Sequence, residues 1–216
     1  MFLEISAIGA ACKKNPFETM EKTLLSGWGR HNKKTLLDFL IRSNCVTMIS
    51  NDTDTYDELC SKIYDKHATN VNNVDSFKQI EDTIVKEFTD TKETVTDSDI
   101  KQVKAFVSEN IKKDYGKTSE RETLKRKINL KPGNTKMYYH KIGNNKIGGL
   151  HDAFDGECLV EIKSRIKQAN VRKNEYDLYQ LFGYLLALNA TKGKIIQTFQ
   201  GTIFESDKLT TTEYGI

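Results

Sequence analysis

The sequence has no long hydrophobic run, few cysteines and no glycine-rich loop that would cradle a phosphate. No apolar stretch approaches the roughly 20 residues that cross a bilayer, which argues against a membrane span. The four cysteines (Cys12, Cys45, Cys60 and Cys158) lack the paired spacing of a metal site and are few for a disulfide framework. There is no signal-peptide pattern, so we expect an intracellular protein with reduced thiols, in the cytoplasm or nucleus.

The chain of 216 residues has a mean hydropathy of −0.57, as expected of a soluble globular protein with one domain or one domain carrying an insertion. Its net charge of +3 conceals a strong asymmetry. Residues 1–50 carry +3, residues 51–100 carry −8 and residues 101–216 carry +8. This asymmetry suggests an N-terminal helical region with an acidic insertion (1–100) and a basic core (101–216).

Hydrophobic periodicity predicts helices in the first half of the chain and a change to strands in the second. Residues 2–42 hold two helical patterns, and residues 51–100 fit amphipathic helices joined by polar loops. The elements predicted after residue 96 are helices at 97–115 and 119–128, separated by an end or bend at Tyr115-Gly116, strands at 136–142, 146–154 and 157–164, a helix at 175–189 and a strand at 195–204 interrupted by Gly201. This order predicts an α/β or α+β core.

The second and third predicted strands form a hairpin whose register follows from its turn. With Asp155-Gly156 as a two-residue loop, Asp152 pairs with Leu159 and becomes the diagonal neighbour of Glu161 on one face. Their β-carbons are then about 7 Å apart or less, near enough for both carboxylates to share one hard cation. Lys163 lies on the same face.

The alternation in this third strand also has a purely structural explanation. Val160 and Ile162 facing a core, with Glu161 and Lys163 facing solvent, make an ordinary amphipathic strand. The neighbouring segments shift the balance toward chemistry, because they add an aspartate on the partner strand and a polar pair one helical turn apart downstream.

Three short motifs occur in order: Gly149-Leu150-His151-Asp152, Glu161-Ile162-Lys163 and Gln180-Leu181-Phe182-Gly183-Tyr184. In this order, on a strand, a strand and a helix, they resemble the PD-(D/E)XK nuclease superfamily, in particular its RecB-like and YqaJ (lambda-exonuclease-like) branches. The resemblance covers residues 115–204 well and 1–30 loosely. It implies a restriction-endonuclease-like core, which is a mixed central β-sheet flanked by helices.

The resemblance also implies a site that holds Mg²⁺, with Mn²⁺ able to substitute. Its metal ligands would be Asp152, Glu161, the backbone carbonyl of Ile162 and Glu120 of the first core helix. Lys163 would orient or help deprotonate the attacking water. The downstream helix would supply supporting side chains, namely Gln180, Tyr184 and Tyr176, the last of which would reach DNA.

Each of these supporting residues has an alternative role. Glu120 equally suits the acidic first turn of a helix. Gln180 and Tyr184 fit the wet edge of a core helix. His151 points to the other face of the hairpin and is not expected to be a ligand, and His31 is expected to lie in a solvated loop.

Basic residues flank the proposed site and suggest sequence-independent, salt-sensitive contacts to phosphates. The candidate nucleic-acid contacts are Arg165, Lys167, Arg172, Lys173, Lys117 and Arg121. A solvated basic face explains them equally well. The acidic segment 51–100 does not bind DNA unaided, so a lid, a surface for a protein partner or oligomer, and a DNA mimic all stay open.

Together these inferences favour a metal-dependent deoxyribonuclease, and in particular an exonuclease that acts on DNA ends in recombination, repair or replication. A structure-selective or sequence-specific endonuclease would use the same site. An RNA endonuclease, and a non-catalytic DNA-binding or assembly protein that retains the fold, are the remaining alternatives.

Overall fold

The computed structural model describes residues 2–15, 19, 20, 23, 52–68, 71, 73–92, 94–133, 136–167 and 174–210. Within these ranges it combines helices with two mixed sheets, so the predicted α+β class is confirmed. The chain divides into two compact units, one formed by residues 43–121 and the other by residues 1–42 with 122–216. These boundaries differ from the division at residue 100 suggested by the sequence. The helical pattern predicted just before residue 42 lies outside the described residues.

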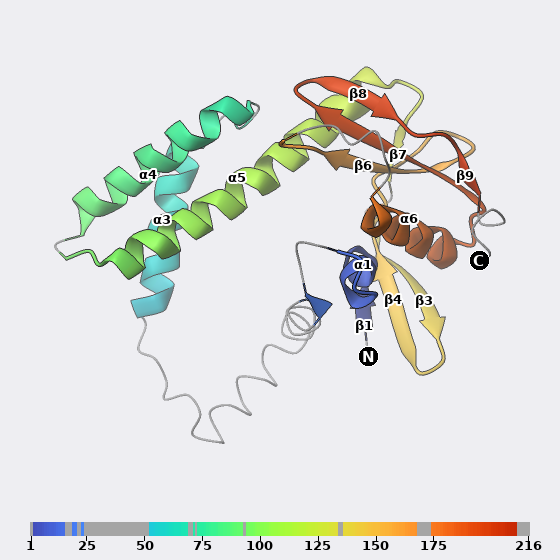
Figure 1. Ribbon diagram of the computed structural model, residues 1–216, viewed down its shortest axis with the longest axis horizontal. Coiled ribbons are helices and arrows are strands. Elements are labelled where there is room, and N and C mark those ends of the chain that lie inside the picture. Colours follow the sequence, from blue (N-terminus) through green and yellow to red (C-terminus); the bar gives the residue numbers. More distant parts are fainter. Residues whose placement is uncertain are drawn as a thin grey trace. The chain divides into compact units, whose positions relative to one another are not determined.

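Figure 1 shows the elements along the chain. The helices are η1 (Ile5–Ala7), α1 (Ile8–Ala11), α3 (Asp52–His67), η2 (Val74–Ser76), α4 (Phe77–Thr91), α5 (Asp97–Arg126) and α6 (Glu175–Leu188). The strands are β1 (Phe2–Glu4), β2 (Lys131–Pro132), β3 (Tyr138–Ile142), β4 (Asn145–Gly149), β5 (Ala153–Phe154), β6 (Leu159–Ser164), β7 (Lys192–Phe199), β8 (Thr202–Glu205) and β9 (Leu209–Thr210). No helix in the described ranges is long and apolar enough to cross a membrane.

The acidic segment folds as amphipathic helices, as predicted. Buried side chains recur about one helical turn apart on α3, α4 and the following α5. In residues 51–100 they include Cys60, Ile63, Tyr64, Ile84 and Phe88, and on α5 they include Val103, Val107 and Ile111. A side-chain hydrogen bond from Tyr64 Oη to Asp114 Oδ2, at 2.8 Å, joins α3 to α5. The acidity of residues 51–100 therefore coexists with an apolar core.

α5 is one uninterrupted helix of 30 residues, so a helix end at Tyr115-Gly116 and a separate helix at 119–128 are wrong. The helix begins with a capping box, in which the Thr96 N–H donates to Asp99 Oδ2 at 2.9 Å and the Asp99 N–H donates to Thr96 Oγ1 at 3.2 Å. A glycine inside a helix costs only about 1 kcal/mol. The buried Tyr115 ring packs edge to face on Phe77, with centroids 5.5 Å apart, and this packing favours continuing the helix.

The strand predicted over 146–154 is in fact two strands in different sheets. β4 lies between β1 and β3 in a three-stranded sheet, whereas β5 belongs to a six-stranded sheet of order β2-β5-β6-β7-β8 in which β9 also pairs with β7. Between β4 and β5 the backbone is held by Gly133, whose N–H donates to the Asp152 carbonyl at 2.8 Å. A β-carbon on Gly133 would lie 1.9 Å from the His151 carbonyl oxygen, so only glycine permits this approach.

The hairpin between β5 and β6 has a wider loop than predicted. Ala153 pairs with Val160, two residues away from the predicted register, and Asp155–Cys158 form the connection. Asp155 explains the difference, because its Oδ1 accepts hydrogen bonds from the N–H groups of Glu157 at 2.9 Å and Cys158 at 2.6 Å. The side chain thereby organises a four-residue loop in place of a two-residue turn.

A register shift of two residues leaves every side chain on its predicted face of the sheet. It moves Asp152 from a position diagonal to Glu161 toward the position opposite it, since Ala153 already lies opposite Val160. The error in the turn therefore does not separate the two carboxylates by face. The predicted strand at 195–204 reverses at Gln200 and Gly201, both with positive φ, and becomes the β7–β8 hairpin.

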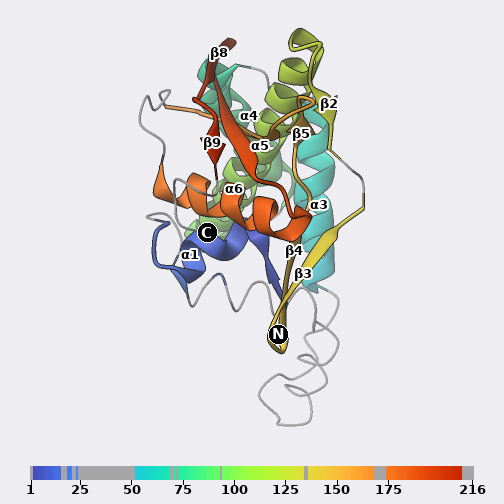
Figure 2. The same ribbon diagram turned by 90° about the vertical axis from the view of Figure 1, so that its right-hand side faces the viewer.

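The six-stranded sheet separates two apolar clusters. On one face, Leu159 and Ile195 pack with Leu181 and Leu185 of α6 and with Ile5, and on the other Val160, Ile162 and Ile196 pack with Leu130 and Leu124. α1 lies beside α6 in both views (Figures 1 and 2). α6 is thus held between the sheet and the N-terminal segment.

Gly183 permits the close approach of α6 to the N-terminal segment. A β-carbon at this position would lie 2.8 Å from Cγ2 of the fully buried Ile5 and 2.5 Å from Ile8 Cδ1. We expect Gly183→Ala to lower the free energy of unfolding by about 1–3 kcal/mol, because overpacking outweighs the better helix propensity of alanine. Gly116→Ala is the matched control: nothing lies within 4 Å of its added β-carbon, so it should stabilise by about 0.5–1 kcal/mol in denaturant unfolding. Equal effects of the two substitutions would contradict the packing argument.

Asp155 is expected to make stability depend on pH in the acid range. Burial opposes its ionisation, but hydrogen bonds from Lys194 (2.7 Å) and from the loop N–H groups outweigh burial and hold the pKa of Asp155 to about 2. Because the pKa is lowered on folding, the stabilisation is complete above about pH 4 and disappears as pH falls toward 2. Asp155→Asn should therefore flatten the dependence of the unfolding free energy on pH between 4 and 2. Glu175→Gln, on an exposed side chain, is the control, and an unchanged slope in Asp155→Asn would refute the assignment.

Candidate active site

The candidate site lies on the face of β6 that is covered by α6. Successive residues of a strand point to opposite faces, so Glu161 and Lys163 share the face of Leu159, which packs against α6. Val160 and Ile162 point into the cluster on the other face. The alternation read from the sequence is therefore present, but its charged face is buried beneath a helix and does not face solvent.

Glu161 is the most deeply buried member of the site, with 1% of its surface exposed. Its Oε1 accepts hydrogen bonds from Lys163 Nζ at 2.6 Å and from Gln180 Nε2 at 2.7 Å. Its Oε2 is buried and has no hydrogen-bond partner among the described residues. Burial raises the pKa of Glu161 above its ordinary value, and the charge of Lys163 opposes the shift.

Lys163 completes a closed triangle with the other two side chains. Its Nζ also donates to Gln180 Oε1 at 2.6 Å, so Gln180 uses both ends of its amide in the site. Burial acts to lower the pKa of Lys163, but the Glu161 carboxylate outweighs it and the pKa lies above the ordinary value. Lys163 is therefore a cation at neutral pH.

Asp152 is tied to the same strand by its side chain. Its Oδ2 accepts a hydrogen bond from the Ile162 N–H at 2.7 Å. Burial raises the pKa of Asp152, while this hydrogen bond and the charge of Lys163 act the other way. The carboxylate is consequently held next to the Glu161-Ile162-Lys163 segment by a specific contact.

Tyr184 lies one helical turn after Gln180 and is buried, with 4% of its surface exposed. A β-carbon on Gly149 would lie 2.8 Å from Tyr184 Cε1 and 3.2 Å from its hydroxyl oxygen, so the glycine provides room for the ring. Burial raises the pKa of Tyr184, and a hydrogen bond with Gln180 opposes the shift. The first and last residues of the three sequence motifs are thus in contact.

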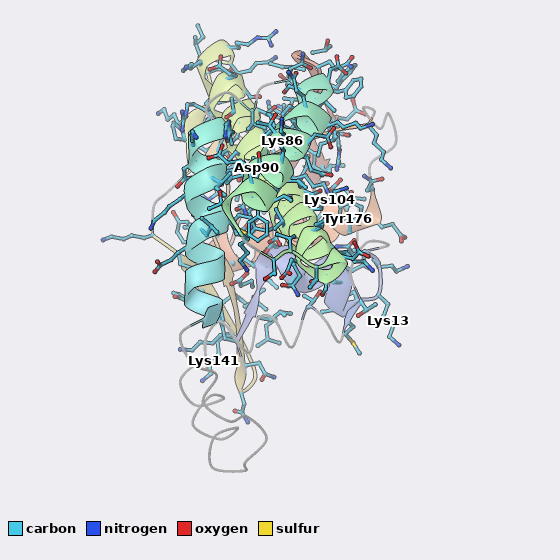
Figure 3. All side chains as sticks on the ribbon, turned by 90° about the vertical axis from the view of Figure 1, so that its left-hand side faces the viewer. Lys13, Lys86, Asp90, Lys104, Lys141 and Tyr176 are labelled. Carbon is cyan, nitrogen blue, oxygen red and sulfur yellow. The ribbon has the colours of Figure 1, made fainter. Side chains whose placement is uncertain are left out.

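Next along the same face is a buried ion pair. Arg165 Nη2 pairs with Asp177 Oδ2, its Nε donates to Gln197 Oε1 at 2.9 Å, and its Nη1 donates to the Tyr176 hydroxyl at 3.2 Å. The side chains of Arg165 and Asp177 are 12% and 1% exposed. Two residues proposed to contact DNA, Arg165 and Tyr176, are therefore engaged within the protein (Tyr176 is labelled in Figure 3).

Asp177 was not identified from the sequence as part of the site, because an acidic residue in the first turn of a helix is common. Its position three residues before Gln180 places it on the face that carries the site, and this spacing was the available signal. Its Oδ1 is buried without a hydrogen-bond partner in the described part of the chain.

The remaining predicted residues belong to other segments of the chain, some of them outside the described residues. Lys167 is exposed. Arg172 and Lys173 are outside the described ranges. Glu120, Lys117 and Arg121 belong to the part of α5 in the other compact unit, where Lys117 pairs with Asp114 at 3.6 Å.

Two of the predicted metal-binding carboxylates, those of Asp152 and Glu161, belong to the cluster on β6. Across the described residues, no group of three or more His, Cys, Asp or Glu side chains is arranged to hold a metal ion. His151 is half-buried, its Nδ1 has no partner in the described structure, and its ring packs against Tyr138 with centroids 5.7 Å apart.

Comparison with known proteins does not assign a family. No family model matches the chain, and no curated protein matches it. Among solved structures, the crystal structure of SSO0001 is similar, with a TM-score of 0.40 and 20% sequence identity over 71% of this chain and 76% of that one. A likeness at this level carries no argument about function.

The Arg165–Asp177 pair is expected to be a main determinant of how α6 is held on the sheet. Removing one partner of a buried ion pair leaves the other charge uncompensated, so Asp177→Ala should lower the free energy of unfolding by about 3–5 kcal/mol. Glu175→Ala, two residues earlier in the same turn, removes an exposed pair with Lys14 and should cost at most about 1 kcal/mol.

A double-mutant cycle with Arg165→Met separates the pair from its surroundings. The double variant should be less destabilised than the sum of the single variants, because neither charge is then left buried alone. Strict additivity of the two effects would show that the ion pair does not act as a unit.

Proposed function

We propose that this protein is a metal-dependent nuclease that hydrolyses phosphodiester bonds of DNA. The supporting observation is that three separate segments come together here. Asp152, before β5, accepts a hydrogen bond from the Ile162 N–H of β6, and Glu161 and Lys163 of β6 bind Gln180 of α6. An amphipathic strand with a solvent-facing acid and lysine would not require this convergence beneath a helix.

The carboxylates fit a hard divalent cation. Mg²⁺ takes oxygen ligands and keeps several waters, so two carboxylates suffice as its main protein ligands. Glu161 Oε2 is buried without a partner among the described residues, and Asp152 supplies the second carboxylate. When bound, the cation would stabilise charge on the phosphate and lower the pKa of a bound water.

The other side chains have roles that follow from their contacts. Lys163, with 20% of its side chain exposed, presents a positive charge at the border of the site, suited to the non-bridging oxygens of a phosphate. It would orient the attacking water or help to deprotonate it. Gln180 fixes Lys163 and Glu161 relative to each other, and Tyr184 supports the helix behind them.

An exonuclease that acts on DNA ends in recombination, repair or replication is the favoured form, because the motif order resembles the RecB-like and YqaJ branches. The second candidate is a non-catalytic DNA-binding protein with the same fold. One observation favours it. Lys163, Gln180 and Glu161 Oε1 hydrogen-bond to one another, so these groups are already paired within the protein.

Cleavage assays on linear, closed circular and single-stranded DNA and on RNA, each with Mg²⁺, test this proposal. We expect linear DNA to be degraded, and Asp152→Asn and Lys163→Met to lower the rate by at least about 100-fold. Glu157→Gln is the matched control, because this exposed carboxylate pairs with Lys192 and Lys208 outside the site. Cleavage of closed circles would replace the exonuclease with an endonuclease.

Metal binding gives a measurement that is independent of activity. A cation that binds only the folded protein raises its melting temperature, so Mg²⁺ or Mn²⁺ should stabilise the wild type but neither Asp152→Asn nor Glu161→Gln. Absence of cleavage on every substrate, together with no metal-induced stabilisation, would sink the enzyme proposal and leave the non-catalytic candidate.

A further inference from the structure

The outer face of the three-stranded sheet carries aromatic and basic side chains that the proposed site does not use. By register, Lys141 lies opposite Lys146, Tyr139 lies opposite Gly148, and Phe2 is the parallel neighbour of Lys146. These side chains share one face, whereas Ile147 points the other way into the core beneath α6. We call Phe2, Tyr139, Lys141 and Lys146 the outer hairpin face.

The aromatic part of this face is a platform over a glycine. The Phe2 and Tyr139 rings are tilted against each other with centroids 5.8 Å apart. A β-carbon on Gly148 would lie 2.9 Å from Tyr139 Cδ1 and 3.0 Å from Phe2 Cε2, so both rings lie down on the strand. Tyr139 is nevertheless 59% exposed, which leaves much of its surface available to a ligand.

The two lysines of this face lie in a segment of the chain that contains no acidic residue. Between Glu122 and Asp152 the sequence contains seven Lys or Arg residues and no Asp or Glu. Lys141 and Lys146, directly opposite each other and both exposed, form a like-charge cross-strand pair, which destabilises a sheet. Within the described ranges neither lysine has an acidic partner, and Glu4, the acid nearest by register, lies opposite Gly148 at the other end of the face.

Protection of a sheet edge explains only part of this pattern. Lysines on an edge strand prevent pairing with another chain, and Lys141 lies on β3, the edge of its sheet. Lys146 lies on β4, the central strand between β1 and β3, where no edge needs protection. An anionic ligand accounts for both lysines.

We propose that the outer hairpin face binds single-stranded DNA, with Lys141 and Lys146 on its phosphates and Tyr139 stacked on a base. An exposed ring beside two lysines combines the two interactions that single strands use, which are stacking and phosphate contacts. The choice of ligand rests on the proposed function. The position is suitable, because Asp152 follows Lys146 by six residues, a span of at most about 20 Å in extended chain.

The hairpin is also placed to present this face. In both views the β3–β4 hairpin extends past α1 and α6, and its turn lies at the end away from the six-stranded sheet (Figures 1 and 2). Lys141 is labelled on it in Figure 3. A single strand of DNA bound here would follow β4 toward the segment that carries Asp152.

Fluorescence anisotropy with a labelled single-stranded oligonucleotide, in EDTA so that no cleavage occurs, tests the inference on the full chain. We expect Lys141→Glu with Lys146→Glu to weaken binding at least tenfold, and the neutral Lys141→Gln with Lys146→Gln to lower the slope of log affinity against log salt by about 1.4. Tyr139→Ala should weaken binding about tenfold, while Tyr139→Phe, which keeps the ring, should bind like the wild type.

The matched control is Lys101→Glu with Lys104→Glu, a pair of exposed lysines on α5 whose reversal changes the net charge equally. If this control loses as much affinity as the hairpin variant, only overall charge matters and the inference is overturned. Thermal unfolding verifies that each variant is folded, and the neutral pair and Tyr139→Phe keep the test valid where the charge reversal fails to fold.

The two proposals fail separately. Binding that depends on Lys141, Lys146 and Tyr139, without cleavage by the wild type, would keep the binding face and remove the nuclease. Cleavage that depends on Asp152 with unchanged affinity in the hairpin variants would keep the nuclease and remove the binding face. Equal affinity for a duplex, with no effect of Tyr139→Ala, would overturn the single-strand assignment.

Discussion

The hydrogen-bonded triangle of Glu161, Lys163 and Gln180 is the constraint on which the site depends. A carboxylate with 1% exposure beneath a helix is costly unless it is paired and hydrogen-bonded. Lys163 satisfies this need from the same strand, two residues on, and Gln180 satisfies it from α6. The position of α6 over β6 is therefore fixed by polar contacts as well as by the apolar cluster around Leu181. Arg165 and Asp177 form a second buried polar contact, one turn earlier on the helix.

Much of this site could be predicted because it depends on parity and order. Alternation along β6 places Glu161 and Lys163 on one face whatever the register, so a turn misjudged by two residues still put Asp152 on the correct side. The turn itself depended on the Asp155 side chain, which competes for backbone N–H groups that a two-residue turn would arrange differently. The hydrophobic pattern of the sequence does not show which of these two turn structures is more stable.

The failures have a common cause, which is burial that only the tertiary structure reveals. Gly116 marks a possible break, yet packing of Tyr115 on Phe77 carries α5 through it. Arg165 looks like a phosphate contact because it follows the Glu161-Ile162-Lys163 motif, but the buried Asp177 on α6 pairs with it. The strand predicted over 146–154 contains no obvious stop, and its division between two sheets depends on a contact with Gly133, far away in sequence.

The passage of the chain from one sheet to the other also determines where its length is free to vary. Two contacts fix the ends of this passage: Gly149 packs against Tyr184, and the Asp152 carboxylate binds the Ile162 N–H. The number of residues between these contacts is therefore constrained. An insertion there would move the aspartate out of step with β6. The loop at Gly156 lies beyond both points, nothing lies within 4 Å of a β-carbon added there, and lengthening this loop leaves the carboxylates in place. Insertions and deletions among related sequences should therefore be found after Ala153, in the loop at Gly156, and be rare before it, between Gly149 and Asp152.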